Sequence, residues 1–442
     1  MLRTYHRVSI SLGSTNLKEK IMKVFLNIVL LLAVILSAAC ASEPQQEQTA
    51  AEPKVSARGP LEPEKFFVFD AHMHPMANAY RGGWNIGDPN DAQFSLSMAR
   101  QGGLGAVFAN TSVDEFYSVN HIAVKEVLRQ FDHMHRQVVL YPDQVGIARD
   151  ADQVRALQKE GKLAVILSIS GGSALESDLA ALRMLHQLGL RLISPMHFFK
   201  NSIGDIAISK ENNGKGSGLT PFGRELVAEM NRLGIIIDLA HASEQTSRDI
   251  IEFSTQPVIN SHVAVEALVD APLNWSDEML RLLGQEGGLI GIPFIPQVIS
   301  AAYHEKWPPR RTANPSSRVT ETDPMEYMGD PAKIYDFIAE KTQGSGSARA
   351  ERARRQRADL PPLSEYVKHI DHVVNLVGID HVCISTDWGA TIVSAAGIEN
   401  AAEFQNVAEA LLDGGYSEED VAKIMGENLL RVFETVVSTA KN

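Results

Sequence analysis

The sequence predicts a single α/β domain that closes into an eight-stranded parallel (β/α)8 barrel of the TIM type. Short apolar segments alternate with amphipathic helical segments through most of the 442 residues. Continuous apolar segments of this length are typical of parallel strands that are buried on both faces. The regular alternation and the chain length together favour one large barrel domain.

The alternation is clearest between residues 218 and 262. A helix is predicted to begin at Pro221 and to end at Gly234, because proline suits the first helical position and glycine suits the residue after the last turn. An apolar strand, Ile235–Leu239, follows and stops just before His241.

The same pattern then repeats. A second helix is predicted over Glu244–Phe253, and a short strand over Pro257–Asn260 stops just before His262. In a parallel barrel the chemistry takes place at the C-terminal ends of the strands. Two consecutive strands that each lead to a histidine therefore indicate a functional rim.

The other elements are expected at regular intervals on either side of this stretch. The remaining strands are predicted over Phe66–Asp70, Leu104–Ala109, Leu163–Ser168, Leu190–Ser194, Leu289–Pro293 and His381–Ser385. The remaining helices are predicted over Asp114–Arg136, Ala151–Glu160, Leu175–Leu188, Glu278–Gly284, Leu363–Val377, Ala401–Leu412 and Glu418–Val437. Val145–Ala148 is expected to be a peripheral segment outside the barrel.

The composition predicts that the chain is divided into three regions. Residues 1–40 resemble a leader, because a charged segment precedes an apolar run that ends in small residues and Cys40. Residues 41–65 are rich in Glu, Gln, Ala and Pro and are predicted to form a disordered tether. Residues 66–442 form the predicted barrel, with a long insertion over 296–362 after the seventh strand.

Cys40 directly follows small residues, a pattern that resembles a bacterial lipobox. This pattern predicts lipidation of Cys40 and a membrane partner in the bacterial cell envelope. The alternatives are an ordinary signal peptide, which would give a periplasmic or secreted protein, and an apolar anchor that is never cleaved.

Charge and cysteine content exclude some classes of protein. The formal net charge of −13 argues against nucleic acid as a partner, and no basic stripe interleaved with aromatic residues is present. Two cysteines cannot build a disulfide framework. Cys383 lies in the middle of a predicted strand and is expected to pack as an apolar thiol.

Histidines gather at the predicted C-terminal ends of the strands. The residues concerned are His72, His74, His197, His241, His262 and, at another strand end, Asp387. Imidazole and carboxylate groups are the ligands that zinc and similar transition metals prefer. The sequence therefore predicts a metal site at this rim. By contrast, His369, Asp371 and His372 lie on a predicted helix before the last strand and are expected to be structural.

A metal at this rim would favour hydrolysis, because a bound divalent ion polarises a carbonyl and lowers the pKa of water. Asp387 is then predicted to carry a proton from the water to the leaving amine. His197 is placed to donate a hydrogen bond to the developing oxyanion.

The chain resembles the membrane (renal) dipeptidase family, which belongs to the amidohydrolase-type barrels. The resemblance runs from about Phe66 to Val437. The matching segments are RQGGLGA at 100–106, GLTPFG at 218–223, EMNRLG at 229–234, IDLAH at 237–241, PVINSH at 257–262, HIDH at 369–372, GIDHV at 378–382, STD at 385–387, GYSE at 415–418 and GENLLRVF at 426–433.

The resemblance implies a two-zinc barrel that hydrolyses dipeptides and accepts a D-residue at the C-terminal side. His72, His241 and His262 match metal ligands of the family. Asp387 matches its catalytic acid and base, and His197 matches a histidine that contacts the substrate. The resemblance also implies a small peptide-like substrate and a homodimer.

Three positions depart from the family pattern. His74 stands where the family has an aspartate, and Ser170 stands where it has a glutamate that bridges the two metals. Leu273 precedes Asn274 where the family has an arginine that binds the substrate carboxylate, although Asn274 itself is retained and is a predicted substrate contact. The loss of two carboxylates favours one zinc ion over two, and manganese or another divalent metal would also suit these ligands.

A single ion would be held by His72, His74, His241 and Asp387, with His262 beside the metal. Three functions stay open. The first is dipeptidase-like hydrolysis of an amide bond in a small peptide-like substrate. The second is a mononuclear amidohydrolase of another specificity, acting on an N-acyl amino acid, a lactam or an amine that is deaminated. The third is a barrel that binds without catalysis.

Overall fold

The computed structural model describes residues 65–88, 93–113, 115–209, 211–308, 346–390 and 393–440. All of them belong to one compact unit, Ser56–Asn442. The predicted leader, Cys40 and all of the predicted tether except Lys65 lie outside the described residues, as does the middle of the predicted insertion. Within the described part of the chain, no helix combines the length and the apolar character that crossing a membrane requires.

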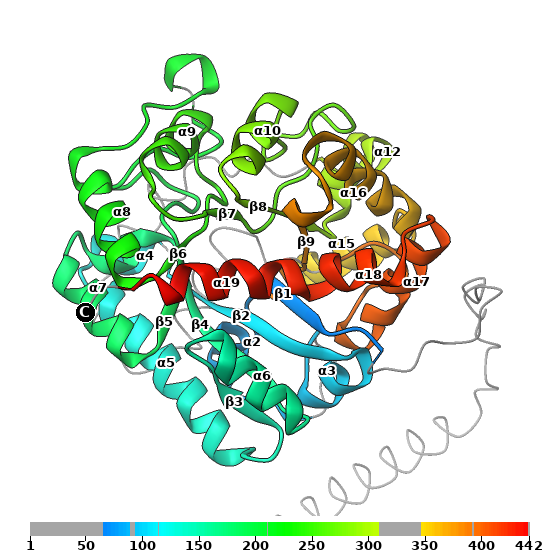
Figure 1. The fold of residues 1–442 in the computed structure, drawn as a ribbon, viewed down its shortest axis with the longest axis horizontal. Coiled ribbons are helices and arrows are strands. Elements are labelled where there is room, and N and C mark those ends of the chain that lie inside the picture. The colour runs from blue at the N-terminus through cyan, green and yellow to red at the C-terminus, as the bar shows by residue number, and fades with distance from the viewer. Residues whose placement is uncertain are drawn as a thin grey trace, which may run out of the picture. The chain divides into compact units, whose positions relative to one another are not determined.

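Eight parallel strands form the centre of the domain (Figure 1). In spatial order they are β1 (Val68–Met73), β2 (Leu104–Ser112), β4 (Leu163–Ser170), β5 (Leu190–Ser194), β6 (Ile236–Ile237), β7 (Ile259–Asn260), β8 (Leu289–Pro293) and β9 (Val382–Ser385). The short strand β3 (Val145–Ile147) pairs only with β4, outside this order. The prediction that this segment is peripheral is therefore confirmed.

Two isolated bridges join the edges of the two sheets. Asp238 pairs with Ile259 between β6 and β7, and Met73 pairs with Trp388 between β1 and the end of β9. Backbone hydrogen bonds support both junctions, including Leu239 N to Ile259 O at 2.7 Å. The strands thus follow one another in a closed cycle, and the predicted (β/α)8 barrel is confirmed.

Helices connect the strands and cover the outside of the barrel. Those before β6 are α2 (Pro75–Gly82), α3 (Leu96–Gly102), α4 (Glu115–Val119), α5 (Ala123–Leu140), α6 (Ala151–Lys159), α7 (Leu179–Leu188) and α8 (Pro221–Leu233). Those after β6 are α9 (Glu244–Phe253), α10 (Asp277–Gln285), α11 (Pro296–Ile299), α12 (Ala301–Lys306), α15 (Gly346–Arg357), α16 (Leu363–Val377), α17 (Phe404–Asp413), α18 (Glu418–Ala422) and α19 (Asn428–Ser438).

Helix α8 shows how local chemistry sets an element. Thr220 caps its N-terminus by accepting a hydrogen bond from the backbone of Gly223 at 3.0 Å, and Pro221 follows as the first helical residue. Gly234 ends the helix with a left-handed φ of 69°. The chain can then turn directly into β6.

Two predicted helices are interrupted. The segment Asp114–Arg136 was expected to form one helix, but His121 adopts a left-handed φ of 54° and separates α4 from α5. The segment Glu418–Val437 contains a π-helical turn, Lys423–Glu427, between α18 and α19. In this turn Gly426 lies so close to the backbone of Phe67 that a side chain would not fit. The interruption thus lets α19 approach the barrel closely.

The inside of the barrel is apolar at the beginning of the strands. Inward residues from all eight strands pack there with side chains of α19, and Figure 1 shows α19 lying across this end of the barrel. Phe433 of α19 contacts Phe69 and Phe108 edge to face, with centroid separations of 6.4 and 5.6 Å. Cys383 belongs to this cluster as a buried free thiol, as predicted. Helix α19 therefore closes the end of the barrel opposite to the strand C-termini.

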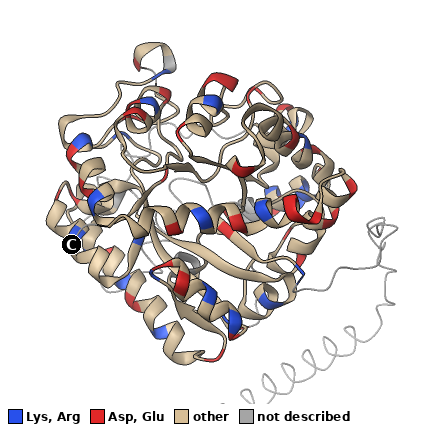
Figure 2. Ribbon diagram, viewed as in Figure 1, with Lys and Arg blue, Asp and Glu red and all other residues tan. Residues whose placement is uncertain are grey.

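Charged residues lie on the outer helices, where both signs are interspersed in this view (Figure 2). One bidentate ion pair links α6 to α19, with Arg155 nitrogens 3.1 and 2.6 Å from the two carboxylate oxygens of Glu434. Such exposed pairs contribute little to stability. Apolar contacts between the barrel and its helices, rather than surface charge, hold the helices in place.

Close backbone packing at one glycine gives a test of the strand arrangement. A Cβ atom on Gly291 of β8 would lie 2.1 Å from the carbonyl oxygen of Ser261. We expect Gly291→Ala to reduce the free energy of unfolding by about 1–3 kcal/mol, because the backbone must move to admit the methyl group. Denaturant unfolding measures the change.

The matched control is Gly105→Ala on β2, where the added atom would meet the movable ring of Phe67 at 2.7 Å. We expect a smaller loss for this variant. Equal losses for the two variants would contradict the tight packing of β8 against the segment that follows β7.

Candidate metal centre

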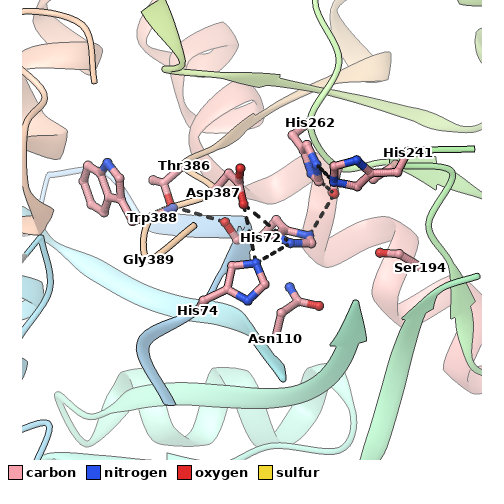
Figure 3. A network of polar contacts seen from close by, with 12 residues as sticks. His72, His74, Asn110, Ser194, His241, His262, Thr386, Asp387, Trp388 and Gly389 are labelled. Atoms are coloured by element: carbon pink, nitrogen blue, oxygen red, sulfur yellow. Dashed lines mark hydrogen bonds and ion pairs between the residues drawn. The ribbon is translucent and has the colours of Figure 1, made fainter. Parts of the chain in front are cut away.

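The centre of the candidate site lies where β1 and β9 end (Figure 3). His72 is the penultimate residue of β1, and His74 occupies the position just before α2. Asp387 follows the last residue of β9 by two positions. All three side chains are buried. The strand was predicted to end at Asp70, but it continues to Met73 and so carries His72, whereas the turn into α2 orients His74.

The three side chains present their ligand atoms to one another. The Nε2 atoms of His72 and His74 are 3.1 Å apart. Asp387 Oδ1 lies 3.5 Å from His74 Nε2 and 3.9 Å from His72 Nε2. One ligand atom from each residue lies within 4.8 Å of both others. Two imidazoles and a carboxylate that converge in this way form a donor set suited to a divalent transition metal.

Hydrogen bonds between the first and last strands fix this arrangement. The backbone N–H of Asp387 donates to His72 O at 2.8 Å, and that of His74 donates to Trp388 O at 2.8 Å. Asp387 has a left-handed φ of 53°, a conformation that costs energy for a residue other than glycine. Backbone strain at the ligand is thus offset by the pairing of the two strand ends.

A buried carboxyl group lies beneath the three residues. Asp70 accepts hydrogen bonds from Thr386 Oγ1 at 2.6 Å, from the Thr386 backbone N–H at 3.0 Å and from the His72 backbone N–H at 3.1 Å. Burial raises the pKa of Asp70 to about 7, against the opposing effect of these hydrogen bonds. The carboxyl group of Asp70 therefore orients the backbone on both sides of the ligands.

His241 and His262 form a second, adjacent pair. Their Nε2 atoms are 3.0 Å apart, and His241 has a left-handed φ of 63°. The ring of His262 lies against that of His72, with a centroid separation of 4.5 Å. The structure thus brings the predicted ligands into one region. His241 and His262, however, do not belong to the group of three residues whose ligand atoms all lie within 4.8 Å of one another.

Burial also sets the protonation of the ligands. Burial is the main cause that lowers the pKa of His72 to about 4, and it holds the pKa of His241 well below its usual value. Both imidazoles are therefore neutral near pH 7, the form that binds a metal. For Asp387, burial raises the pKa, but the hydrogen bond with His74 and the charges of nearby histidines outweigh it and keep the pKa below the ordinary range.

The other predicted site residues occupy different positions. His197 is buried and its ring lies 4.9 Å from that of His241, while the neighbouring Phe198 is half exposed beside both. Asn274 donates its two amide hydrogens to Val269 O and Val298 O, at 2.8 and 2.9 Å. Its predicted contact with substrate stays a prediction.

Ser170 ends β4 at the rim, as expected. It pairs with Ser112 of β2 and Ser194 of β5, and its hydroxyl oxygen is buried with no hydrogen-bond partner within the described structure. A small neutral side chain thus occupies the position where the resemblance implies a bridging carboxylate.

Two important residues were missed in the sequence analysis. Asp238 and Ser261 are fully buried beneath the histidines, and Ser261 contacts two of them. A signal was present, because each stands two residues after an apolar residue of the inner cluster, Ile236 or Ile259. Alternate strand residues face the same side. The same step of two leads from Leu192 to Ser194.

Comparisons with known proteins identify the family of the chain. Residues 63–442 match the model of a family described as membrane dipeptidase (peptidase family M19).

The chain belongs to the membrane dipeptidase family.

Similar proteins include the dipeptidase tcpJ of Claviceps purpurea (strain 20.1), which is 31% identical over 352 residues covering 78% of this chain and 69% of the relative. The structure of the probable dipeptidase PvdM from Pseudomonas aeruginosa has a TM-score of 0.67 and 25% identity, covering 86% of this chain and 97% of that one.

A third similar structure is a metallopeptidase from Rhodobacter sphaeroides, liganded with a phosphinate mimic of the dipeptide L-Ala-D-Ala. Its TM-score is 0.65 at 21% identity, and the match covers 84% of this chain and 99% of that one. This likeness concerns the fold. Membership of the membrane dipeptidase family identifies the chain as a dipeptidase-type metallohydrolase that acts on peptide bonds.

His369 has the structural contacts that its position on a helix predicts. Its Nδ1 accepts a hydrogen bond from Val265 N at 3.1 Å, and its Nε2 donates to Ile299 O at 3.2 Å. The ring thus links the loop after β7 to α11. To make both hydrogen bonds it must carry a proton on Nε2 and a lone pair on Nδ1. Burial lowers its pKa to about 4.

This contact predicts a pH effect on stability. Between pH 6.5 and 4 the unfolded state binds a proton at His369 that the folded state does not, so stability falls as pH falls. We expect His369→Gln to remove up to about 3 kcal/mol of that loss. Unfolding of both metal-free proteins at pH 7 and pH 4.5 measures the difference. An identical pH dependence would contradict a neutral His369.

Proposed function

We propose that the protein is a zinc-dependent hydrolase that cleaves the amide bond of a small peptide-like substrate. The observation that carries this proposal is the convergence of His72, His74 and Asp387 at the C-terminal rim of the barrel, in a member of the membrane dipeptidase family. Active sites of such barrels lie at this rim. Zinc suits a set of imidazole and carboxylate ligands.

His72, His74 and Asp387 would hold the ion, with His241 and His262 as the adjacent ligands. When bound, the ion supplies a Lewis acid that polarises a carbonyl and lowers the pKa of water. Asp387 accepts a proton from the attacking water and returns it to the leaving amine nitrogen. Its depressed pKa keeps the side chain ionised, which is the form that has a lone pair for that proton.

His197 is proposed to contact the substrate. Its ring packs against His241 and Phe198 at the rim, which supports a hydrogen bond to the carbonyl oxygen as negative charge develops there. The dipeptide mimic in the Rhodobacter sphaeroides structure supports a substrate of similar size.

A second candidate is a mononuclear amidohydrolase that acts on another amide, such as an N-acyl amino acid or a lactam. Ser170 favours it, because a buried hydroxyl stands where a bridging carboxylate would be needed to offset the repulsion between two dications. The half-buried, uncharged Leu273 favours it too, since it offers no cation for a free carboxylate.

Metal content and a matched pair of variants test this function. We expect close to one zinc per chain in protein purified without chelators, and loss of most of it in His72→Ala. We expect Asp387→Asn to reduce kcat about 10²–10⁴-fold, because the proton acceptor is lost. Mass spectrometry gives the metal content, and a panel of dipeptides and N-acyl amino acids gives the activity.

The control is His381→Gln, which alters a histidine just before β9, at the opposite end of the strand from Asp387. It should retain both metal and activity. Two zinc ions per chain would contradict the single-ion arrangement. Full hydrolysis by Asp387→Asn would contradict the role of Asp387.

We also propose that the protein is anchored in the bacterial cell envelope by a lipid on Cys40. The small residues before Cys40 support this location. We expect Cys40→Ser to move the protein from the membrane fraction to the periplasm or medium, while Cys383→Ala leaves it in the membrane fraction. Membrane recovery of Cys40→Ser would contradict lipidation. A homodimer, implied by the resemblance, is likewise a proposal and would be measured by sedimentation.

A further inference from the structure

We propose that Ser261 is a positioning residue whose single hydroxyl, anchored on Asp238, holds His72 and His262 as Nδ1–H tautomers, so that both imidazoles direct a bare Nε2 toward a metal. This inference rests on the proposed function, because it assigns the residue that prepares two of the proposed ligands. Ser261 is fully buried at the C-terminal end of β7.

Three side-chain contacts meet at one oxygen atom. Ser261 Oγ lies 3.0 Å from His72 Nδ1, 2.8 Å from His262 Nδ1 and 2.7 Å from Asp238 Oδ2. A serine hydroxyl has one hydrogen to donate and two lone pairs to accept with. Its capacity is therefore filled by these three neighbours.

The direction of each hydrogen bond follows from Asp238. Its Oδ1 accepts from the backbone N–H of Ala240 and of Ser261, at 3.1 and 2.8 Å. Its Oδ2 accepts from the hydroxyls of Ser194 and Ser261, at 2.5 and 2.7 Å. With a donor at every contact, the carboxylate acts only as an acceptor, and the hydrogen of Ser261 must point to it.

Both imidazoles must then donate to Ser261 Oγ. Each carries its proton on Nδ1, and each Nε2 is left with a lone pair. The Nε2 of His72 faces His74 at 3.1 Å, and the Nε2 of His262 faces His241 at 3.0 Å. One hydroxyl therefore determines which ring nitrogen can bind a metal in one histidine of each pair. Residues that fix metal ligands in this way strongly affect metal affinity.

Ser194 provides a matched control within the same network. Like Ser261 it is fully buried and donates to Asp238 Oδ2, but its side-chain hydrogen bond is made to the carboxylate and not to an imidazole. Loss of packing or of one hydrogen bond to Asp238 would affect both serines alike. Only a role in orienting the histidines would make substitution of Ser261 differ in its effect from substitution of Ser194.

The experiment compares Zn²⁺ binding by the full-length, metal-free protein and three variants, by competition with a chromophoric chelator in the absence of substrate. We expect Ser261→Ala to weaken binding about 10–100-fold. We expect Ser194→Ala to stay within about 3-fold of the wild type, and Ser261→Thr, which keeps the hydroxyl, to bind better than Ser261→Ala. Equal losses in Ser261→Ala and Ser194→Ala would overturn the proposal.

A second measurement observes the tautomers in the wild-type network directly. In metal-free wild-type protein with ¹⁵N-labelled histidine, NMR distinguishes the two neutral tautomers by their nitrogen shifts, and His72→Gln and His262→Gln assign the signals. We expect Nδ1–H at both residues, and Nε2–H at either would overturn the proposal. This measurement is independent of hydrolysis, so failure of the proposed function and failure of the tautomer assignment give different results.

Discussion

The hydrogen bonds between Asp70 and Thr386 hold together the part of the barrel on which the candidate metal centre depends. They join the first barrel strand to the last, and the backbone contacts beside them place His72, His74 and Asp387 together. Because these contacts are buried, their loss would leave polar groups without water or a partner. The candidate metal centre therefore depends directly on the closure of the barrel.

A change of chemistry along each strand explains why the site lies at one end. Inward residues near the strand starts are apolar and pack against α19. The next inward positions are polar, as in the steps from Ile236 to Asp238 and from Ile259 to Ser261. A barrel interior cannot bury polar groups in its apolar half without a large cost. The same alternation thus forms an apolar core near the N-terminal ends of the strands and the candidate site at their C-terminal ends.

The barrel and its rim were predictable because they follow from local pattern. Apolar segments and the residues that follow them placed β5 and β8 correctly and put His72, His241, His262 and Asp387 at strand ends. What the pattern missed depends on contacts between distant strands. The grouping of His74 with Asp387, apart from His241, and the role of Ser261 under two rings arise only when the barrel closes. Periodicity within one strand does not contain that information.

The position of the closing contact also has a consequence for synthesis. Asp70 and Thr386 are 316 residues apart in the chain, so they form one of the most distant contacts in the domain. Contacts that close so long a loop form late, since their entropic cost is met only after nearer elements have docked. On the ribosome, a chain emerging from its N-terminus exposes His72 long before Asp387 exists. The ligands from the two ends of the barrel can therefore meet only after the last strand has been made.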